Sequence, residues 1–321
     1  MKRIPIFLLA ASVLAASLTA CGSPAASSSS APPSSAPSSA AQAYTFTDDL
    51  GRTVTVEQPE RVAALIGSFA DVWCLAGGQD TLVAAAHDAW TSFDLGLSDT
   101  VADLGAVKEP NLEVLLAAQP DFILASCNTT ADLELESTFE SAGIPTAYFD
   151  IQSFDDYLNM LKICTDLTGC PENYETYGLQ VQEQVKAAKA RQDGSAPTVL
   201  TIRATGSSCK VKGSSDFLLG EMLADLGCVN VADSETSLLE ELSLESILAA
   251  DPDYIFVVLQ GSDATDAQET LEKTLLSNPA WGSLRAVQEG RFHTLEHSLY
   301  NLKPNARWGE AYEKLADILY P

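Results

Sequence analysis

Two glutamates, Glu113 and Glu245, occupy the same position in a motif that the chain contains twice. The motif reads Asn-Leu-Glu-Val-Leu-Leu-Ala-Ala-Gln-Pro-Asp-Phe-Ile-Leu from Asn111 and Ser-Leu-Glu-Ser-Ile-Leu-Ala-Ala-Asp-Pro-Asp-Tyr-Ile-Phe from Ser243. Asn and Ser are good N-cap residues, so each copy predicts a short helix, a Pro-Asp turn and a strand. The helix dipole favours a carboxylate in the first turn by about 0.3–1 kcal/mol whatever its function. A matched, exposed pair could also dock onto a basic partner.

A second group of polar and aromatic residues follows the predicted strands. In a parallel α/β sheet, ligands bind beyond the carboxyl ends of the strands. Arg203 ends an otherwise apolar strand, where a guanidinium needs an anionic or carbonyl partner, so it is the strongest single candidate. The rule selects as ligand-binding residues Ser68, Phe69, His87, Trp90, Asn128, Thr129, Arg203, Thr205, Lys212, Gln260, His297 and Tyr300.

Several of these candidates have a plain structural alternative. Trp90 and Tyr300 could simply pack the core, and Lys212 could be solvated. Arg307, near the start of the last helix, could bind ligand or pair with an acid such as Glu310.

Strand and helix patterns alternate from Tyr44 onwards, which predicts an α/β protein with mainly parallel sheets. Buried strands are predicted at 61–66, 81–86, 122–125 and 145–149, and again at 198–203, 254–259 and 291–295. The repeated motif falls at the same place in each series. The sequence therefore predicts two similar lobes with a ligand cleft between them.

A helical segment separates the two series. Ser153 with Asp156 three residues later predicts a helix start, and Pro171 begins a second helical pattern that continues to Arg191. A helix of about 20 residues is about 30 Å long and resists bending, so we expect only modest closure of the lobes. The predicted divisions are a signal peptide at 1–20, a tether at 21–43, a lobe at 44–152, a helical connector at 153–192 and a lobe at 193–321.

The first residues have the pattern of an export signal. Lys2 and Arg3 precede a short apolar run that ends at Leu-Thr-Ala-Cys21, which resembles the lipobox of bacterial lipoproteins. The following Ser/Ala/Pro segment cannot bury enough surface to fold, so it predicts a flexible tether. We expect a protein lipidated at Cys21 and held at the outer face of the cytoplasmic membrane, in a Gram-positive cell.

The composition restricts the partners. The chain has 18 basic and 44 acidic residues, a formal charge of −26, which becomes −28 once a segment with Lys2 and Arg3 is removed. Such a charge argues against nucleic acid or anionic lipid head groups and favours a basic partner. Six cysteines follow Cys21, and Cys164 with Cys170 is the closest pair, so they either form a disulfide or are buried as small apolar side chains.

Residues 44–321 resemble the helical-backbone solute-binding proteins of iron-siderophore, haem and cobalamin ABC importers. The likeness rests on the order of several segments: Arg61-Val-Ala-Ala-Leu before a helix and Gly-Gly, the paired Glu motifs, Asn278-Pro-Ala-Trp with Ala-Val-Gln-Glu-Gly-Arg, and Lys303-Pro-Asn-Ala-Arg-Trp308. The resemblance implies a monomer that captures a small-molecule metal chelate and delivers it to a permease dimer with a cytoplasmic ATPase. It also implies that Glu113 and Glu245 dock onto the permease. No cofactor and no dedicated metal site are expected, although the ligand itself could contain Fe or Co.

Other functions are less consistent with the sequence. No hydrolase, zinc-protease, Walker or dinucleotide motif occurs, which argues against an enzyme. A surface protein that senses or relays a ligand without importing it stays open. Among ligands, Arg203 and Lys212 favour an anionic ferric siderophore, ahead of cobalamin or another corrinoid, with haem third.

Overall fold

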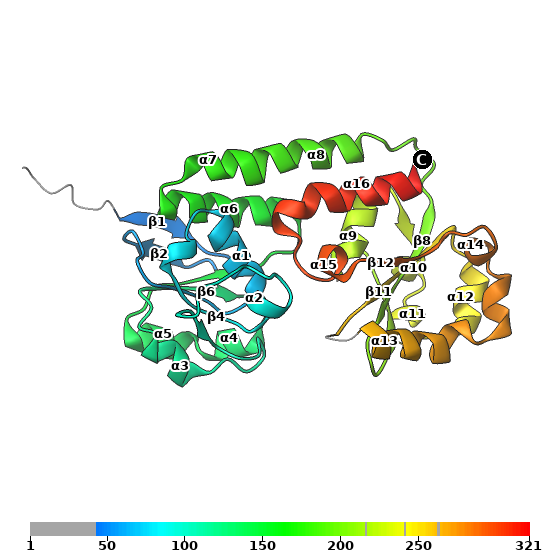
Figure 1. The fold of residues 1–321 in the computed structure, drawn as a ribbon. Coiled ribbons are helices and arrows are strands. Elements are labelled where there is room, and N and C mark those ends of the chain that lie inside the picture. Colours follow the sequence, from blue (N-terminus) through cyan, green and yellow to red (C-terminus); the bar gives the residue numbers. More distant parts are fainter. Residues whose placement is uncertain (1–42, 216, 241, 262–263) are drawn as a thin grey trace, which may run out of the picture. The chain divides into compact units, whose positions relative to one another are not determined.

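The computed structural model describes residues 43–321 except 216, 241 and 262–263. The predicted signal peptide, Cys21 and nearly all of the tether lie outside these residues. The described chain contains two five-stranded sheets and a separate two-stranded hairpin, with helices between the strands (Figure 1). No helix among the described residues is long and apolar enough to cross a membrane.

The N-terminal sheet is entirely parallel, with strand order β5-β4-β3-β6-β7. Its strands are short and almost wholly buried, as expected when helices cover both faces. They are β3 Val62–Ala64, β4 Leu82–Ala85, β5 Ala102–Asp103, β6 Phe122–Ser126 and β7 Thr146–Phe149. The helices of this lobe are α1 Gly67–Leu75, η1 Gln79–Thr81, α2 Asp88–Thr91, α3 Leu112–Ala117, α4 Thr130–Glu134 and α5 Glu136–Ala142.

The C-terminal sheet has the order β10-β8-β11-β12, and β9 joins β8 in an antiparallel pair. These strands are β8 Thr198–Ala204, β9 Cys209–Lys212, β10 Val229–Asn230, β11 Tyr254–Leu259 and β12 Phe292–Leu295. The helices are α9 Leu218–Asp225, α10 Val231–Ser234, α11 Ser237–Glu240, α12 Leu244–Ala250, α13 Ala264–Leu271, η3 Glu272–Leu276, η4 Pro279–Ser283, α14 Arg285–Gln288 and α15 His297–Tyr300. The predicted α/β architecture with mainly parallel sheets is confirmed.

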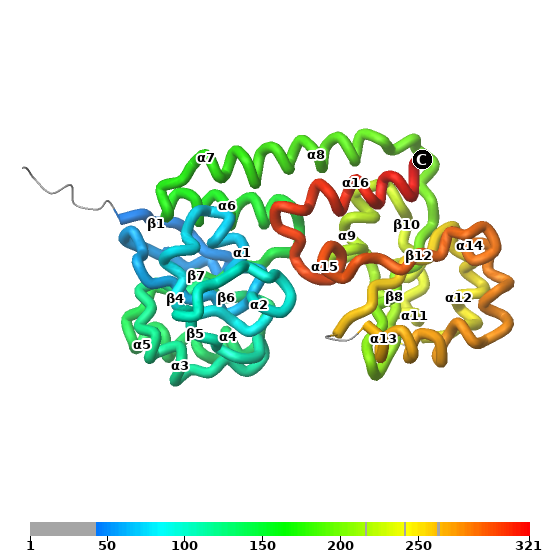
Figure 2. The backbone as a smooth tube through the Cα atoms, in the orientation of Figure 1, coloured from blue at the N-terminus to red at the C-terminus, as the bar shows by residue number. Residues whose placement is uncertain are grey.

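The connector consists of α6 Phe154–Thr168, α7 Pro171–Tyr174, η2 Glu175–Leu179 and α8 Gln180–Lys189 (Figure 2). Ser153 caps α6 in a full capping box with Asp156, as the sequence predicts. The stretch after Pro171 is not a uniform α-helix, however, because η2 is a π-helical turn. The Tyr157 hydroxyl of α6 donates to the Tyr177 carbonyl in this turn at 2.8 Å.

One hydrophobic cluster lies beneath the connector and the last helices, η5 Asn305–Arg307 and α16 Trp308–Leu319. It includes Val62 and Phe122 from the first sheet and Val199 and Phe256 from the second. Two smaller clusters fill the other faces of the two sheets. The inner faces of both sheets are therefore packed against one shared helical layer.

The structure adds one element that the sequence analysis missed and decides between the two alternatives for the closest cysteine pair. The segment 44–56 forms a hairpin of β1 Tyr44–Thr47 and β2 Thr53–Val56, which the sequence analysis missed. Cys164 and Cys170 do not form a disulfide, and every cysteine of the described chain is unpaired. Cys164 is instead fully buried in the shared cluster, where it packs as a small apolar side chain.

Asp132, in α4, is a buried carboxylate close to the end of β6. Its Oδ2 accepts a hydrogen bond from the Ser126 amide at 2.8 Å, whereas its Oδ1 has no partner among the described residues. Burial raises the pKa of Asp132 to about 7, against a smaller lowering effect of the Ser126 amide.

The raised pKa predicts a pH-dependent gain in stability for Asp132→Asn. Because the folded carboxyl binds its proton more tightly than the unfolded one, the stability of the wild type falls as pH rises through the window from about 4 to about 7. The variant keeps an acceptor for the Ser126 amide. Its free energy of unfolding, relative to that of the wild type, should therefore increase by about 2–3 kcal/mol from pH 5 to pH 8. Urea unfolding of both proteins at the two pH values measures this difference, and a constant difference would contradict the assignment.

Candidate ligand-binding site

The strand ends of the N-terminal lobe are acidic. His87, exposed after β4, shares a 2.7 Å hydrogen bond between its Nδ1 and Asp103 Oδ2. Burial tends to raise the pKa of Asp103, but hydrogen bonds from the Gly105 amide and His87 outweigh it, so the pKa is lowered. Asn128, exposed after β6, donates to Asp150 Oδ1 at 2.5 Å. Thr129 is half-buried and precedes α4.

Three predicted ligand contacts have buried side chains in this structure. Phe69 is 3% exposed and packs edge-on against Phe149. Tyr300 is 1% exposed, and its hydroxyl donates to the Ala311 carbonyl at 3.0 Å. Ser68 is also buried. The strand-end rule selects loops by their position in the sheet, and it does not distinguish a side chain that turns into the core from one that turns toward the solvent. Trp90 is half-buried against the shared cluster.

A basic face lies on β8 and β9 of the C-terminal lobe. The antiparallel register pairs Arg203 with Lys210 and Thr201 with Lys212. Residues directly opposite each other in such a pair point to the same face of the sheet. Arg203, Lys210 and Lys212 therefore share one face, while Val211 and Ile202 pack into the core on the other. We refer to these three residues as the basic face.

Two of the three cationic side chains of the basic face, Arg203 and Lys210, have no neutralising partner among the residues that the structure describes. Neither Arg203 nor Lys210 has a hydrogen bond or ion pair from its side chain to the described part of the chain, and Arg203 is only half-buried. Sequence analysis identified Arg203 and Lys212 but missed Lys210. The alternation Cys209-Lys-Val-Lys212 was the available signal, because period-two alternation predicts a strand with one charged face.

Other predicted contacts at the strand ends of this lobe have structural roles. The Thr205 hydroxyl holds the β8–β9 turn through the amides of Ser207 and Ser208. Gln260 is half-buried after β11, and its backbone N–H donates to the Ala204 carbonyl. His297 has its Nδ1 3.0 Å from the Leu259 carbonyl, and burial lowers the pKa of its imidazole. A neutral ring with Nδ1–H donating leaves Nε2 as an acceptor.

A cavity of about 250 Å³ brings together loops from the two lobes. One wall comes from α1 and the segment after α2, and the other from α15 and the segment before α16. Its lining residues are Asp71, Leu75, Ser92, Phe93, Ser298, Lys303, Pro304, Ala306 and Arg307. Burial lowers the pKa of Lys303, while Asp150, Glu221 and Asp156 act in the opposite direction. The cavity joins segments of both lobes, but none of the twelve ligand-binding residues predicted from the sequence lines it.

Arg307 is held by acids of its own lobe. Its guanidinium forms ion pairs with Glu310 at 2.7 Å and Glu296 at 3.0 Å, and these partners raise its pKa. The alternative that Arg307 pairs with Glu310 is thus confirmed.

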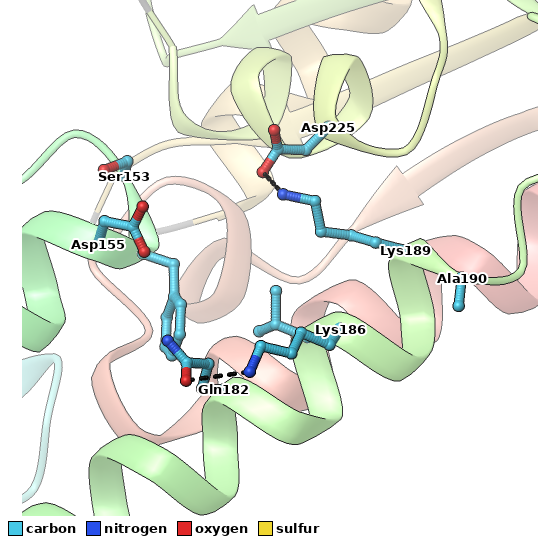
Figure 3. A pocket seen from close by; sticks show the side chains of 9 residues that line it. Ser153, Asp155, Gln182, Lys186, Lys189, Ala190 and Asp225 are labelled. Atoms are coloured by element: carbon cyan, nitrogen blue, oxygen red, sulfur yellow. Dashed lines mark hydrogen bonds and ion pairs between the residues drawn. The ribbon is translucent and has the colours of Figure 1, made fainter.

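A cavity of about 610 Å³ lies against the connector rather than at the strand ends. Figure 3 shows Lys189 of α8 reaching Asp225 of α9, and Lys186 beside Gln182. Lys186 also pairs with Glu183. Because both lysines are already neutralised and substantially exposed, this groove is a poorer site for a charged ligand than the basic face.

The paired glutamates have equivalent surroundings. Asn111 caps α3 through the Val114 amide, and Ser243 caps α12 through the Ser246 amide, as predicted. Glu113 and Glu245 are exposed in the first turns of these helices. The Asn111 amide donates to Leu104, directly after β5, so Glu113 lies at the carboxyl-end edge of its sheet.

Two α/β lobes packed against a shared helical layer, with a cavity between segments of both lobes, are the architecture of a two-lobed solute-binding protein. Comparison with known proteins agrees. The family model described as "Periplasmic binding protein" matches residues 62–299. The chain therefore belongs to the periplasmic binding protein family. It is an extracytoplasmic solute-binding component of an ABC importer and not an enzyme.

Individual relatives are distant. The iron-uptake system-binding protein of Bacillus subtilis (strain 168) is 25% identical over 222 residues, which cover 68% of this chain and 67% of the relative. The Fe(3+)-citrate-binding protein YfmC of the same organism is 24% identical over 261 residues, 79% of this chain and 78% of that protein. The solved structure of the siderophore binding protein BauB, bound to a complex between two molecules of acinetobactin and ferric iron, aligns with a TM-score of 0.68 at 19% identity, over 86% of this chain and 99% of that one.

The position of Tyr300 predicts a structural role only. Tyr300→Phe should lower the free energy of unfolding by about 1 kcal/mol, because the hydrogen bond to Ala311 is lost. The affinity for ligand should stay the same, because the side chain lies in the core. Urea unfolding and ligand titration of the same preparation test both statements, and an intact unfolding curve with weakened binding would restore Tyr300 as a ligand contact.

Proposed function

We propose that this protein captures an anionic metal chelate, with a ferric siderophore as the first candidate, and delivers it to an importer. The observation that carries the proposal is the cross-strand pair of Arg203 and Lys210 on the basic face. Like charges directly opposite each other destabilise a sheet, and two unit charges 4 Å apart still repel by about 1 kcal/mol in water. An anion bound at the carboxyl end of β8 would offset this repulsion, which explains why a strongly acidic chain has two cations there.

The chemistry of ferric siderophores fits this surface. Many carry carboxylates or other anionic oxygens around the iron, and guanidinium and ammonium groups recognise these through charge-assisted hydrogen bonds. The names of the two Bacillus relatives, for iron uptake and Fe(3+)-citrate binding, and the ferric acinetobactin complex of BauB support the same class of ligand.

Haem is a second candidate because of His297. The Nδ1 bond to Leu259 and the lowered pKa leave a neutral imidazole with Nε2 as an acceptor, the form that ligates haem iron. Binding of haem would require His297, whereas binding of an anionic siderophore would require the basic face. The two candidates therefore separate by mutation.

The basic face predicts a charge-selective loss of binding. Arg203→Ala and Lys210→Ala should each weaken the affinity for ferric citrate by about tenfold or more, since a hydrogen bond to a charged group contributes about 1.5–3 kcal/mol. Quenching of intrinsic tryptophan fluorescence reports the titration. Lys273→Ala, at an exposed lysine of η3, is the matched control and should bind as the wild type does.

The same titrations with haem and with cyanocobalamin complete the test. Loss of ferric citrate binding in the basic-face variants, with no effect in the control, supports an anionic chelate. Saturable binding of haem or the corrinoid by a wild type that ignores a broad panel of ferric chelates would replace the proposed ligand.

The finer localisation is also part of the proposal. The lipobox at Cys21 and the Ser/Ala/Pro tether support a lipid anchor at the outer face of the cytoplasmic membrane, in a Gram-positive cell. We propose that the folded part acts as a monomer, with the tether allowing it to reach a permease dimer.

The paired glutamates are proposed to dock onto that permease. Their exposure, their matched positions and the acidic charge of the chain suit a basic partner with two similar halves. Rim charges set the rate and orientation of an encounter more than its affinity.

Glu113→Ala with Glu245→Ala should therefore leave ligand affinity unchanged and abolish ligand-stimulated uptake. Asp99→Ala with Glu269→Ala, at two other exposed acids, removes the same charge elsewhere and should not affect uptake. Normal transport by the glutamate variant would remove the docking role.

A further inference from the structure

Asn305 connects the C-terminal segment to α1 across 237 residues of sequence. Its Nδ2 donates to the Ser68 carbonyl and to Asp71 Oδ2, both at 2.8 Å. The side chain is 1% exposed, so these bonds form where water does not compete with them. We refer to Ser68, Asp71 and Asn305 as the Asn305 junction.

The backbone at Asn305 is as specific as its side chain. Its φ is 49°, in the left-handed region that few residues other than Gly, Asn and Asp adopt without strain. Glycine would suit this backbone but could not make the two hydrogen bonds. Asparagine meets both requirements, which indicates that the contact to α1 matters as well as the turn before α16.

The surroundings of the junction are buried and polar. Burial raises the pKa of Asp71, and the hydrogen bond from Asn305 opposes this shift. The Ser68 hydroxyl and the Trp308 indole Nε1 are buried without a hydrogen-bond partner among the described residues. Each such atom costs free energy, which indicates that the local packing is kept for another reason. Trp308 also packs against Phe154 of α6, at 5.8 Å between ring centres, so three helices meet here.

The junction lies beside the cavity that joins the two lobes. Asp71 lines one wall of this cavity, and Lys303, Pro304, Ala306 and Arg307 line the other. Asn305 itself lies between the residues of the second wall and bonds to Asp71 of the first. The loop after β4 is fixed to the same helix, because Asp88 Oδ1 accepts the Gly67 amide at 2.8 Å. The distance between the two walls thus depends directly on the bonds of Asn305.

We propose that Asn305 is a positioning residue for ligand binding: it sets the spacing of the cavity walls by holding the C-terminal segment on α1. This inference rests on the proposed function and adds the premise that the bound chelate, held by the basic face, also contacts this cavity. The hydrogen bonds of Asn305 to Ser68 and Asp71 are present without ligand, so they can be tested in the ligand-free protein.

The experiment exchanges donor and acceptor. Asn305→Asp keeps the size and the tolerance for a left-handed backbone but replaces the Nδ2 donor with an acceptor that faces Asp71. Combining it with Asp71→Asn supplies a new donor and restores one hydrogen bond. Asn159→Asp, at an exposed position of α6, adds the same charge outside the junction and serves as the control.

Two measurements separate this inference from the proposed function. Hydrogen exchange of the ligand-free protein should show α1 amides exchanging about tenfold faster in Asn305→Asp, with recovery toward the wild type in the double variant. Affinity for ferric citrate should fall by about tenfold in Asn305→Asp and recover in the double variant, while the control matches the wild type in both measurements.

Each outcome decides a different question. Wild-type exchange in Asn305→Asp, or a loss that the double variant does not recover, overturns the junction. If hydrogen exchange recovers in the double variant but Asn305→Asp binds ligand with wild-type affinity, the positioning role is overturned. The junction would then only stabilise the fold. If the wild type binds no ferric chelate at all, the proposed ligand fails, and the same comparison is repeated with haem, which the second candidate function supplies.

Discussion

The burial of both sheets against one helical layer is the constraint on which the rest of the structure depends. Each sheet presents an apolar inner face, and helices of its own lobe, α1 in the first and α9 in the second, cover part of that face. The connector and α16 supply the common cover, and a single hydrophobic cluster results. Because side chains in such a cluster are close-packed, the lobes cannot slide freely beneath it. The two sheets are thereby held on one common support.

The chemistry of the cleft follows from the alternation of side chains along β8 and β9. Every second residue enters the core of the C-terminal lobe, and the residues between them must point the other way. On most of β8 this second face is also buried, by Val199 and Thr201. Toward the carboxyl end burial decreases, and the same face continues with the half-buried Arg203 and the lysines of β9. The position of the basic face thus follows from the alternation along β8 and β9. The presence of arginine and lysine at these positions is what the function has to explain.

The sequence predicted the elements well where periodicity was strong. The strands β6, β8 and β11 are continuous apolar runs, and the caps at Asn111, Ser153 and Ser243 are side-chain hydrogen bonds that depend on local sequence alone. It failed where the deciding contacts are distant. The hairpin β1–β2 is fixed by Arg52, which pairs with Glu136 and donates to the Thr146 carbonyl, neither of which is near in sequence. Phe69 and Tyr300 follow strands as ligand contacts would, but tertiary packing turns them inward. The register that pairs Arg203 with Lys210 required knowledge that β9 is a strand.

The π-helical turn in the connector has a consequence for its phase. Such a turn accommodates one residue more than an α-helical turn, and each residue of a helix advances the side chain by about 100°. The apolar positions of α8, Val181, Val185 and Ala188, face the core only because η2 inserts this extra residue before them. Loss of one residue from η2 would therefore let the helix continue as a regular α-helix with α8 in its present orientation. If the turn became α-helical with no residue removed, α8 would rotate by about 100° and direct part of its polar side toward α16. The orientation of α8 thus depends on the geometry of this one turn as well as on the length of the connector.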